Sequence, residues 1–187
     1  MLVEVGGADE ALSLALWARQ ARVPAGEIVP AAATVLFDDV SDLDTLRSLL
    51  DGWDLGAEPA TGHVVEILVD YDGEDLAAVA EHWGTDPDGV VERHAGLEFV
   101  VEFCGFSPGF AYLAGLPEEL AVPRLDTPRA QVPAGAVGLA STWCAAYPTA
   151  SPGGWRLIGR TDALLWDAGR EQPALLPPGT RVRFRPT

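Results

Sequence analysis

The chain has 187 residues, enough to bury one sizeable core or two smaller ones. Its 12 basic and 28 acidic residues give a net charge of −16, which disfavours nucleic acid and anionic membranes as partners, because phosphate groups require basic patches. All 12 basic residues are arginine, which excludes chemistry that needs a lysine of this chain, such as Schiff-base formation or a P-loop.

The two cysteines and the hydropathy pattern indicate a cytoplasmic protein. Cys104 and Cys144 are too few for a disulfide framework and lack metal-ligand spacing, so we expect small buried side chains, with a thiol nucleophile as the open alternative. No apolar run approaches the ~18 residues that span a bilayer, and no basic segment precedes an apolar one at the N-terminus. We therefore expect the chain in the cytoplasm.

The first half of the chain alternates predicted strands and helices. Leu76, Val79 and Ala80 have the i, i+3, i+4 spacing of one helical face. Ser41, followed by Asp44 three residues later, predicts a capping box at the start of another helix. The predicted strands span residues 2–5, 27–38, 63–70 and 97–103, and the predicted helices span 9–22, 41–52, 76–83 and 86–96.

The second half is dense in Gly and Pro and has no helical period longer than two turns. Short apolar runs separated by turn residues are typical of an all-β barrel. The candidate short strands are Val132 and residues 137–140, 157–159, 164–166 and 182–184. The fold class is therefore predicted to be α+β, with a small N-terminal α/β sandwich over residues 1–95 and a β-barrel over 96–187. The boundary is placed near residues 92–98.

Several common catalytic and metal motifs are absent from the sequence. It contains no CxxC pair, HExxH or GxxxxGK segment, and no metal ligands or catalytic residues are assigned. His82 is expected at the surface or at a boundary position, and His63 begins a predicted strand, so neither is assigned to a site. His94 ends a predicted helix, where a positive charge is favoured, so a capping role and a role in a binding site both stay open.

The arginines of the second half suggest an anion site. Arg124 and Arg129 each follow a proline, which stiffens the backbone, and Arg160 ends a predicted strand. Guanidinium groups suit bidentate binding of carboxylate or phosphate. The alternative is that they pair with nearby carboxylates, namely Glu118, Glu119, Asp126 or Asp162. Likewise, six aromatic residues are candidates for pocket walls or for core, namely Phe106, Phe110, Tyr112, Trp143, Tyr147 and Trp155.

Four segments resemble one protein family. They are GFSPGFAYLAGL (105–116), PRLDTPRAQVPAG (123–135), YPTASPGGWRLIGRT (147–161) and LLPPGTRVRF (175–184). These segments resemble those of the 5-oxoprolinase B subunit, whose family includes the kinase inhibitor KipI and allophanate hydrolase subunit 1. The chain also resembles subdomains C and D of the carboxyltransferase domain of urea carboxylase.

The resemblance implies a cyclophilin-like barrel and a multi-subunit enzyme. The expected partners are the C subunit, of the KipA or allophanate hydrolase subunit 2 type, and the A subunit. The complex uses ATP to open 5-oxoproline to L-glutamate, and this chain, which has no nucleotide motif, is expected to bind no cofactor and to be inactive alone. The small carboxylate substrate is expected to contact residues at the matching positions: His94, Phe106, Phe110, Tyr112, Arg124, Arg129, Tyr147, Ser151, Trp155 and Arg160.

One segment departs from the family pattern. Many members have a polar, Gly-rich run before the Tyr-Pro pair, whereas residues 141–146 read STWCAA. The bulkier side chains are expected to narrow a pocket there. The alternatives kept open are a KipI-like inhibitor of a histidine kinase and a protein related to allophanate hydrolase or urea carboxylase.

Overall fold

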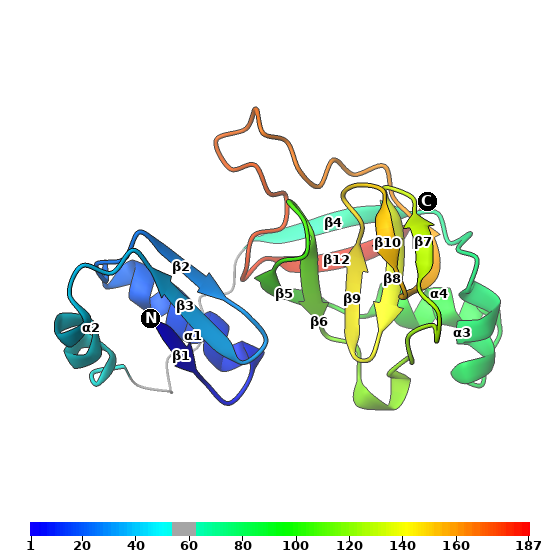
Figure 1. The fold of residues 1–187 in the computed structure, drawn as a ribbon. Coiled ribbons are helices and arrows are strands. Elements are labelled where there is room, and N and C mark those ends of the chain that lie inside the picture. Colours follow the sequence, from blue (N-terminus) through cyan, green and yellow to red (C-terminus); the bar gives the residue numbers. More distant parts are fainter. Residues whose placement is uncertain (54–62) are drawn as a thin grey trace.

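A computed structural model describes residues 1–53 and 63–187 of the chain. These residues pack around two separate apolar cores, one within residues 1–53 and one within residues 63–187 (Figure 1). The smaller unit joins a sheet to two helices, and the larger one is built on a barrel-like sheet. The predicted α+β class, with a barrel in the second half of the chain, is therefore confirmed.

The N-terminal unit is a three-stranded antiparallel sheet covered by helices. The sheet has the order β1-β3-β2, and the elements are β1 (Leu2–Glu4), α1 (Ala8–Gln20), β2 (Glu27–Pro30), β3 (Thr34–Asp38) and α2 (Leu43–Leu50). The single strand predicted over 27–38 is a hairpin, because the N–H of Ala31 donates to the carbonyl of Thr34 and turns the chain. Asp42 rather than Ser41 caps α2, and its carboxylate accepts from the N–H groups of Asp44 and Thr45.

The larger sheet has seven strands and closes almost completely on itself. Its order is β11-β8-β9-β6-β5-β12-β4, with β4 (Val64–Val69), β5 (Phe99–Cys104), β6 (Ala111–Ala114), β8 (Ala136–Ala140), β9 (Trp143–Ala146), β11 (Arg156–Arg160) and β12 (Arg181–Pro186). The chain after β4 joins the two ends of this order, since Asp70 and Arg160 exchange backbone hydrogen bonds and Gly73 donates to Ile158. A separate pair, β7 (Arg129–Val132) and β10 (Ser151–Gly153), lies beside this sheet (Figure 1).

The predicted boundary near residues 92–98 is wrong, because the elements just before it belong to the barrel. Strand β4 pairs in parallel with β12 along its whole length. Helices α3 (Leu76–His82) and α4 (Pro87–Gly96) contact β11 and β12 respectively. Residues 63–95 therefore complete the C-terminal unit instead of forming part of an N-terminal sandwich.

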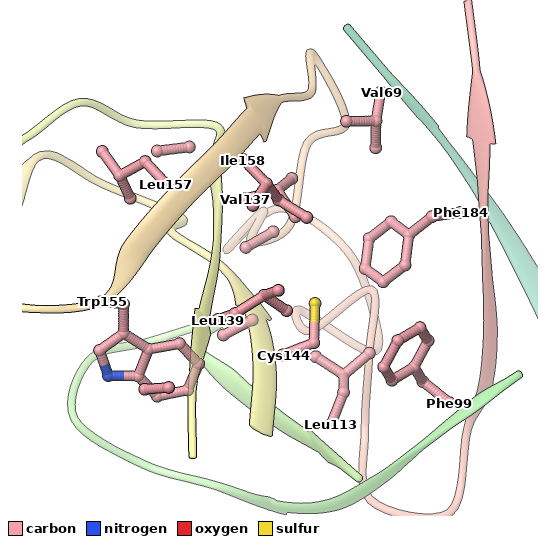
Figure 2. Packing of buried hydrophobic residues seen from close by; sticks show 14 of the residues in the cluster. Val69, Phe99, Leu113, Val137, Leu139, Cys144, Trp155, Leu157, Ile158 and Phe184 are labelled. Carbon is pink, nitrogen blue, oxygen red and sulfur yellow. The ribbon is translucent and has the colours of Figure 1, made fainter. Parts of the chain in front are cut away.

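The barrel core is a continuous set of apolar side chains from nearly every strand. Figure 2 shows Phe184 of β12 and Phe99 of β5 beside Leu113 of β6 and Cys144 of β9. The two phenylalanine rings meet edge to face with centroids 5.5 Å apart.

Three of the short strands, β6, β9 and β10, were not predicted, whereas the predicted strand 164–166 is only a single bridge between Trp166 and Ala174.

The two units meet where α1 lies against β5. A pocket of about 330 Å³ at this contact is lined by side chains from both units, including Asp9 and Leu12 of α1 and Glu98 and Glu102 of the barrel. Glu98 is neutralised by Arg181 and Arg183 of β12. Burial, with a smaller contribution from the charge of Asp9, raises the pKa of Glu102 from its ordinary 4.5 to about 7.

Glu102 makes stability depend on pH. Its folded pKa lies above its unfolded value, so the folded state keeps the proton longer, and stability is lost as pH rises from about 5 through 7. We expect Glu102→Gln to raise the melting temperature at pH 8 by about 2–4 °C and to change it little at pH 4.5. Thermal unfolding across this pH range measures the effect. Glu119→Gln, on the exposed 3₁₀ turn Glu118–Leu120, is the control, and an equal gain at both pH values would contradict the explanation.

Candidate functional site

A pocket of about 250 Å³ on the barrel brings together most of the predicted binding residues. It lies where the loop after β5, the segment before β7 and strand β10 meet. Six of the ten predicted residues line it, together with four small or cyclic residues that were not in the predicted set. The lining consists of Phe106, Phe110, Tyr112, Arg124, Pro128, Tyr147, Pro152, Gly153, Gly154 and Trp155.

Aromatic rings form a connected wall of this pocket, which we call the aromatic pocket. Phe110 is central, with its ring centroid 5.2 Å from that of Tyr147 and 5.7 Å from that of Trp155, both nearly perpendicular. Tyr112 contacts Phe110 and Trp155 in turn. Three of these rings, those of Phe110, Tyr147 and Trp155, are almost entirely buried, so the wall is held rigid by the core behind it.

Phe106 stands at the mouth of the pocket in an unusual conformation. Its φ is +67°, a region that bulky side chains avoid, and the residue is 62% exposed. A tight turn holds it, since Ser107 donates to the carbonyl of Gly105 and Phe110 donates to the carbonyl of Ser107. Backbone strain of this kind is often kept where a side chain serves binding, and this side chain packs edge to face against Phe110.

Arg124 is the charged group of the aromatic pocket. Its guanidinium carbon lies 5.8 Å from the centre of the Trp155 ring, and the next residue, Leu125, donates its N–H to the carbonyl of Gly154. Arg124 is exposed, and no carboxylate among the described residues pairs with it. It is therefore available to bind an anion that enters the pocket.

Tyr147 and Gly153 form the floor of the pocket. A Cβ atom on Gly153 would lie 2.5 Å from the phenol oxygen of Tyr147, so only glycine fits there. Burial raises the pKa of the Tyr147 phenol, and the positive charge of Arg124 acts in the opposite direction. The phenol stays protonated at neutral pH and offers a neutral hydroxyl group. The role of Gly153 in shaping the floor was not predicted from the sequence, although its place beside Gly154 in the SPGGW segment was a signal.

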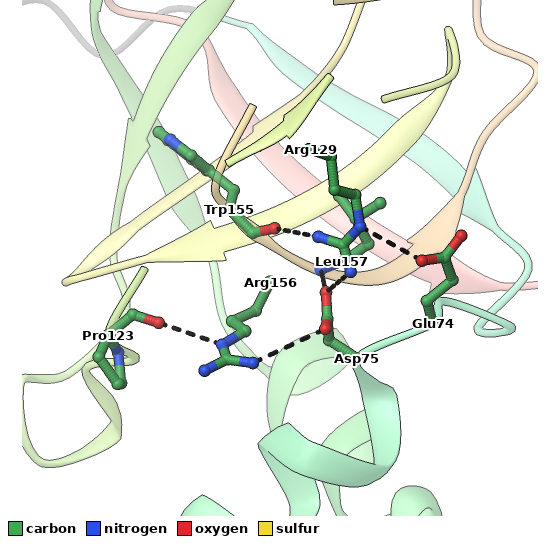
Figure 3. A network of polar contacts seen from close by, with 7 residues as sticks. All are labelled: Glu74, Asp75, Pro123, Arg129, Trp155, Arg156 and Leu157. Atoms are coloured by element: carbon green, nitrogen blue, oxygen red, sulfur yellow. Dashed lines mark hydrogen bonds and ion pairs between the residues drawn. The ribbon is translucent and has the colours of Figure 1, made fainter. Parts of the chain in front are cut away.

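Arg129 and Arg160, predicted to bind substrate, are instead held by carboxylates. Arg129 donates to Asp75 at 2.8 Å and to Glu74 at 3.2 Å (Figure 3). Arg160 pairs with Asp70 at 3.0 Å and with Asp72 at 2.9 Å, and it borders a different pocket. The predicted alternative of ion pairing was right for both residues, but the partners come from residues 70–75 rather than from the nearby acids that we named.

Asp75 is the centre of the network drawn in Figure 3. It lies just before α3 and is 7% exposed. Its carboxylate accepts from Arg129 and from the N–H of Leu157, and it lies 3.8 Å from Arg156. Arg129 also donates to the carbonyl of Trp155 at 3.3 Å. The network thus fixes the backbone that carries the Trp155 wall of the aromatic pocket, although sequence analysis assigned no role to Asp75.

His94 does not line the aromatic pocket. It is fully buried, with Nδ1 2.7 Å from the Tyr71 hydroxyl and Nε2 3.4 Å from the sulfur of Cys144. Burial lowers the pKa of its imidazole to about 3, so it is neutral and serves the core. This overturns its prediction as a binding residue. Ser151 lies in β10 beside the pocket wall, but its side chain does not line the pocket.

The divergent segment 141–146 does not narrow the aromatic pocket. Trp143 packs behind it, with its ring centroid 5.3 Å from Phe103 and 6.0 Å from Tyr112. Ser141 and Thr142 border a separate hollow near Leu116. None of residues 141–146 lines the aromatic pocket, so the expected narrowing does not concern this pocket.

The cysteine thiols are not activated. Burial raises the pKa of Cys104 to about 11 and raises that of the fully buried Cys144 as well. In residues 1–53 and 63–187 no His, Cys, Asp and Glu side chains gather in a group of three or more fit for a metal ion. Within the same ranges no helix combines the length and the apolar character needed to cross a membrane.

Comparison with known proteins places this chain in a family. Residues 1–176 match the family described as "Carboxyltransferase domain, subdomain C and D". The chain is 47% identical over 149 residues to the 5-oxoprolinase B subunit of Escherichia coli O157:H7, covering 77% of this chain and 68% of that protein. It is 42% identical over 156 residues to the 5-oxoprolinase B subunit of Haemophilus influenzae, covering 81% and 73%.

Solved structures with a similar fold support the same assignment. TTHA0988 superposes with a TM-score of 0.83 at 35% identity over the whole of this chain, which spans 39% of that longer one. The urea carboxylase of Kluyveromyces lactis superposes on the whole of this chain through 21% of its own length, with a TM-score of 0.67. The sequence identity is 17%, so this match shows a shared fold alone. On this sequence identity and coverage, the chain belongs to the family of the 5-oxoprolinase B subunit, built on subdomains C and D of the carboxyltransferase domain.

Proposed function

We propose that this chain is the B subunit of an ATP-dependent 5-oxoprolinase, which opens 5-oxoproline to L-glutamate together with the A and C subunits. The observation that carries the proposal is the 47% identity over 149 residues to a protein of that name. The aromatic pocket supports it, because Arg124, which pairs with no carboxylate of the described residues, lies beside apolar rings and suits a small, compact carboxylate.

The chemistry assigned to this chain is binding and orientation. The substrate carboxylate would lie on the guanidinium of Arg124, which can donate two parallel hydrogen bonds. The carbon atoms of the five-membered ring would pack against Phe110 and Trp155, and the Tyr147 hydroxyl would donate to a polar atom of the substrate. A lactam held in one orientation reacts faster because the entropy of positioning is removed from the activation barrier.

ATP use and ring opening are proposed for the assembled complex. The lactam amide is stable, and phosphorylation of its carbonyl oxygen followed by attack of water would open it. We place the nucleotide on another chain of the complex and expect this chain to be inactive alone. The exposed Phe106 at the mouth of the aromatic pocket is consistent with a site that a second protein covers. The urea carboxylase likeness adds no second function, since it reflects the fold alone.

Reconstitution tests this proposal. The chain is co-purified with A and C subunits of a 5-oxoprolinase, and glutamate release from 5-oxoproline is followed with and without ATP. We expect release only when all three proteins and ATP are present. Omission of this chain should reduce release to background. No release from the complete mixture would refute the enzyme assignment.

A further inference from the structure

The cavity of about 330 Å³ between the two units is separate from the aromatic pocket. Its apolar walls come from Leu12 of α1, which is 2% exposed, from Val100 of β5 and from Ala114 at the end of β6. Gly115 completes them, and a Cβ atom there would lie 2.6 Å from the carbonyl oxygen of Glu98, so no larger residue can fill the space. Apolar cavities at the contact between structural units are common sites for small ligands.

Glu102 reaches this cavity through an irregularity in strand β5. Val101 pairs with Leu113 of β6, and Phe103 pairs with Tyr112, so Glu102 is an extra residue without a partner across the ladder. A bulge of this kind redirects a side chain and is frequent beside binding sites. The bulge thus places Glu102 in the lining of the cavity.

The negative charge at the cavity has no positive partner there. No ion pair among the described residues includes Asp9 or Glu102, which line the cavity from α1 and from the barrel. Glu98, the third acidic residue of the lining, binds Arg181 and Arg183 of β12, so these two arginines are already paired. Uncompensated carboxylates in an apolar cavity favour a positively charged ligand, because a partly buried charge is costly without a partner.

Other charged groups near β5 lie outside the cavity. Arg19 of α1 interacts with Cys104 at the end of β5 and donates to the carbonyl of Ile28 in β2. Strand β2 also contacts β5, and it carries Glu27. Neither Arg19 nor Glu27 lines the cavity, so the three acidic residues of the lining determine its charge.

We propose that this cavity binds a small organic cation, an amine or amidine on an apolar body, whose nitrogen donates to Glu102 while its carbon atoms pack against Leu12 and Val100. Asp9 supplies a second carboxylate from the other unit, so the bound cation joins α1 to the barrel. Ca²⁺ and Mg²⁺ are disfavoured, because they take about six or more oxygen ligands and the apolar side chains of the walls offer none. An anion is repelled by the uncompensated carboxylates. Binding at this site does not depend on the 5-oxoprolinase assignment.

Binding of the cation depends on pH through Glu102. Burial, with a smaller contribution from the charge of Asp9, raises the pKa of Glu102 to about 7, and the bound cation requires the ionised carboxylate. The ionised fraction rises from about one tenth at pH 6 to about nine tenths at pH 8. We therefore expect the affinity to increase about tenfold over this range, with release of a proton from Glu102 on binding near pH 7.

Isothermal titration calorimetry with benzamidine tests the site, and benzamide is the matched neutral control of the same shape. The wild-type chain should bind benzamidine with a Kd on the order of 0.1–1 mM at pH 8 and about tenfold more weakly at pH 6. Benzamide should bind at least about tenfold more weakly than benzamidine at pH 8, because it cannot pair with the carboxylates.

Glu102→Gln removes the charge and keeps the shape of the side chain. We expect this variant to bind benzamidine about tenfold more weakly at pH 8, with little dependence on pH between 6 and 8. The variant should fold, because loss of the half-buried charge stabilises the chain at pH 8. Glu119→Gln, which changes an exposed carboxylate outside the cavity, should bind benzamidine like the wild type.

Amide chemical shifts locate the bound benzamidine. Addition at pH 8 should shift the amide signals of Leu12, Val100 and Ala114 and leave those of Phe110 and Trp155 in the aromatic pocket unchanged. Equal affinity for benzamide and benzamidine, or wild-type affinity in Glu102→Gln, would overturn the proposal. Shifts confined to the aromatic pocket would also overturn it, because the cation would then occupy a different site.

Discussion

Replacing Asp75 with alanine is expected to lower the free energy of unfolding by about 3–4 kcal/mol. The substitution leaves the N–H of Leu157 buried without an acceptor and leaves Arg129 and Arg156 without their shared carboxylate. Both arginine side chains are only 20–27% exposed, so water replaces the lost partner incompletely. The melting temperature should fall by about 10 °C, measured by calorimetry or circular dichroism.

Glu74→Ala is the matched control for Asp75→Ala. Glu74 is the preceding residue and pairs with the same Arg129, but its side chain is 74% exposed. Such a pair contributes less than about 1 kcal/mol, so the melting temperature should change by no more than about 3 °C. Equal losses for the two variants would show that the charge on Arg129, and not the buried hydrogen bonds of Asp75, determines stability.

Arg124→Ala is expected to reduce kcat/KM for 5-oxoproline in the reconstituted complex by about 100-fold, mainly through a higher KM. The proposed role of Arg124 is to bind the substrate carboxylate in both the ground state and the transition state, so its loss weakens binding more than turnover. Arg124→Lys keeps the positive charge but loses the planar guanidinium that donates two parallel hydrogen bonds. Its kcat/KM should therefore lie between those of the wild type and Arg124→Ala. The melting temperature should stay within about 2 °C of the wild type, because Arg124 has no carboxylate partner among the described residues.

Arg47→Ala provides the comparison for Arg124→Ala. Arg47 is an exposed arginine on α2 that pairs with Asp44, far from the aromatic pocket in sequence and in a different unit. Its removal should leave kcat/KM unchanged. If the KM of both variants equals that of the wild type, the aromatic pocket does not bind the substrate, and the substrate carboxylate must be held elsewhere.

The predicted helices and strands were mostly correct because they depend on local patterns. Residues 76–83 have helical spacing and form α3, and residues 63–70 have β-branched composition and contain β4. What could not be predicted was the partner of β4. Its pairing with β12 joins residues separated by more than 100 positions, as Glu66 and Arg185 show, and neither strand carries a local mark of the other. The domain boundary was misplaced for this reason.

The candidate site was predictable in part for a similar reason. Phe106, Phe110 and Tyr112 lie within one loop and strand, so their shared place follows from sequence proximity. Arg124 and Arg129 looked equivalent, because each follows a proline in the same segment. They differ because Asp75, 54 residues away from Arg129, meets only one of them. A charge that is free cannot be distinguished from one that is paired until the fold brings the distant carboxylate into place.

The parallel pairing of β4 with β12 has a consequence for synthesis on the ribosome. Arg185 follows Glu66 by 119 residues, and at about 5–20 residues per second the nascent β4 waits about 6–24 seconds for its neighbour. During that interval the edge of β4 that pairs with β12 and the apolar residues Ile67 and Val69 lack their final cover. The N-terminal unit has its own core and can fold in the meantime. Aggregation during translation should therefore begin at β4, and chaperones that bind extended apolar segments should recognise it first.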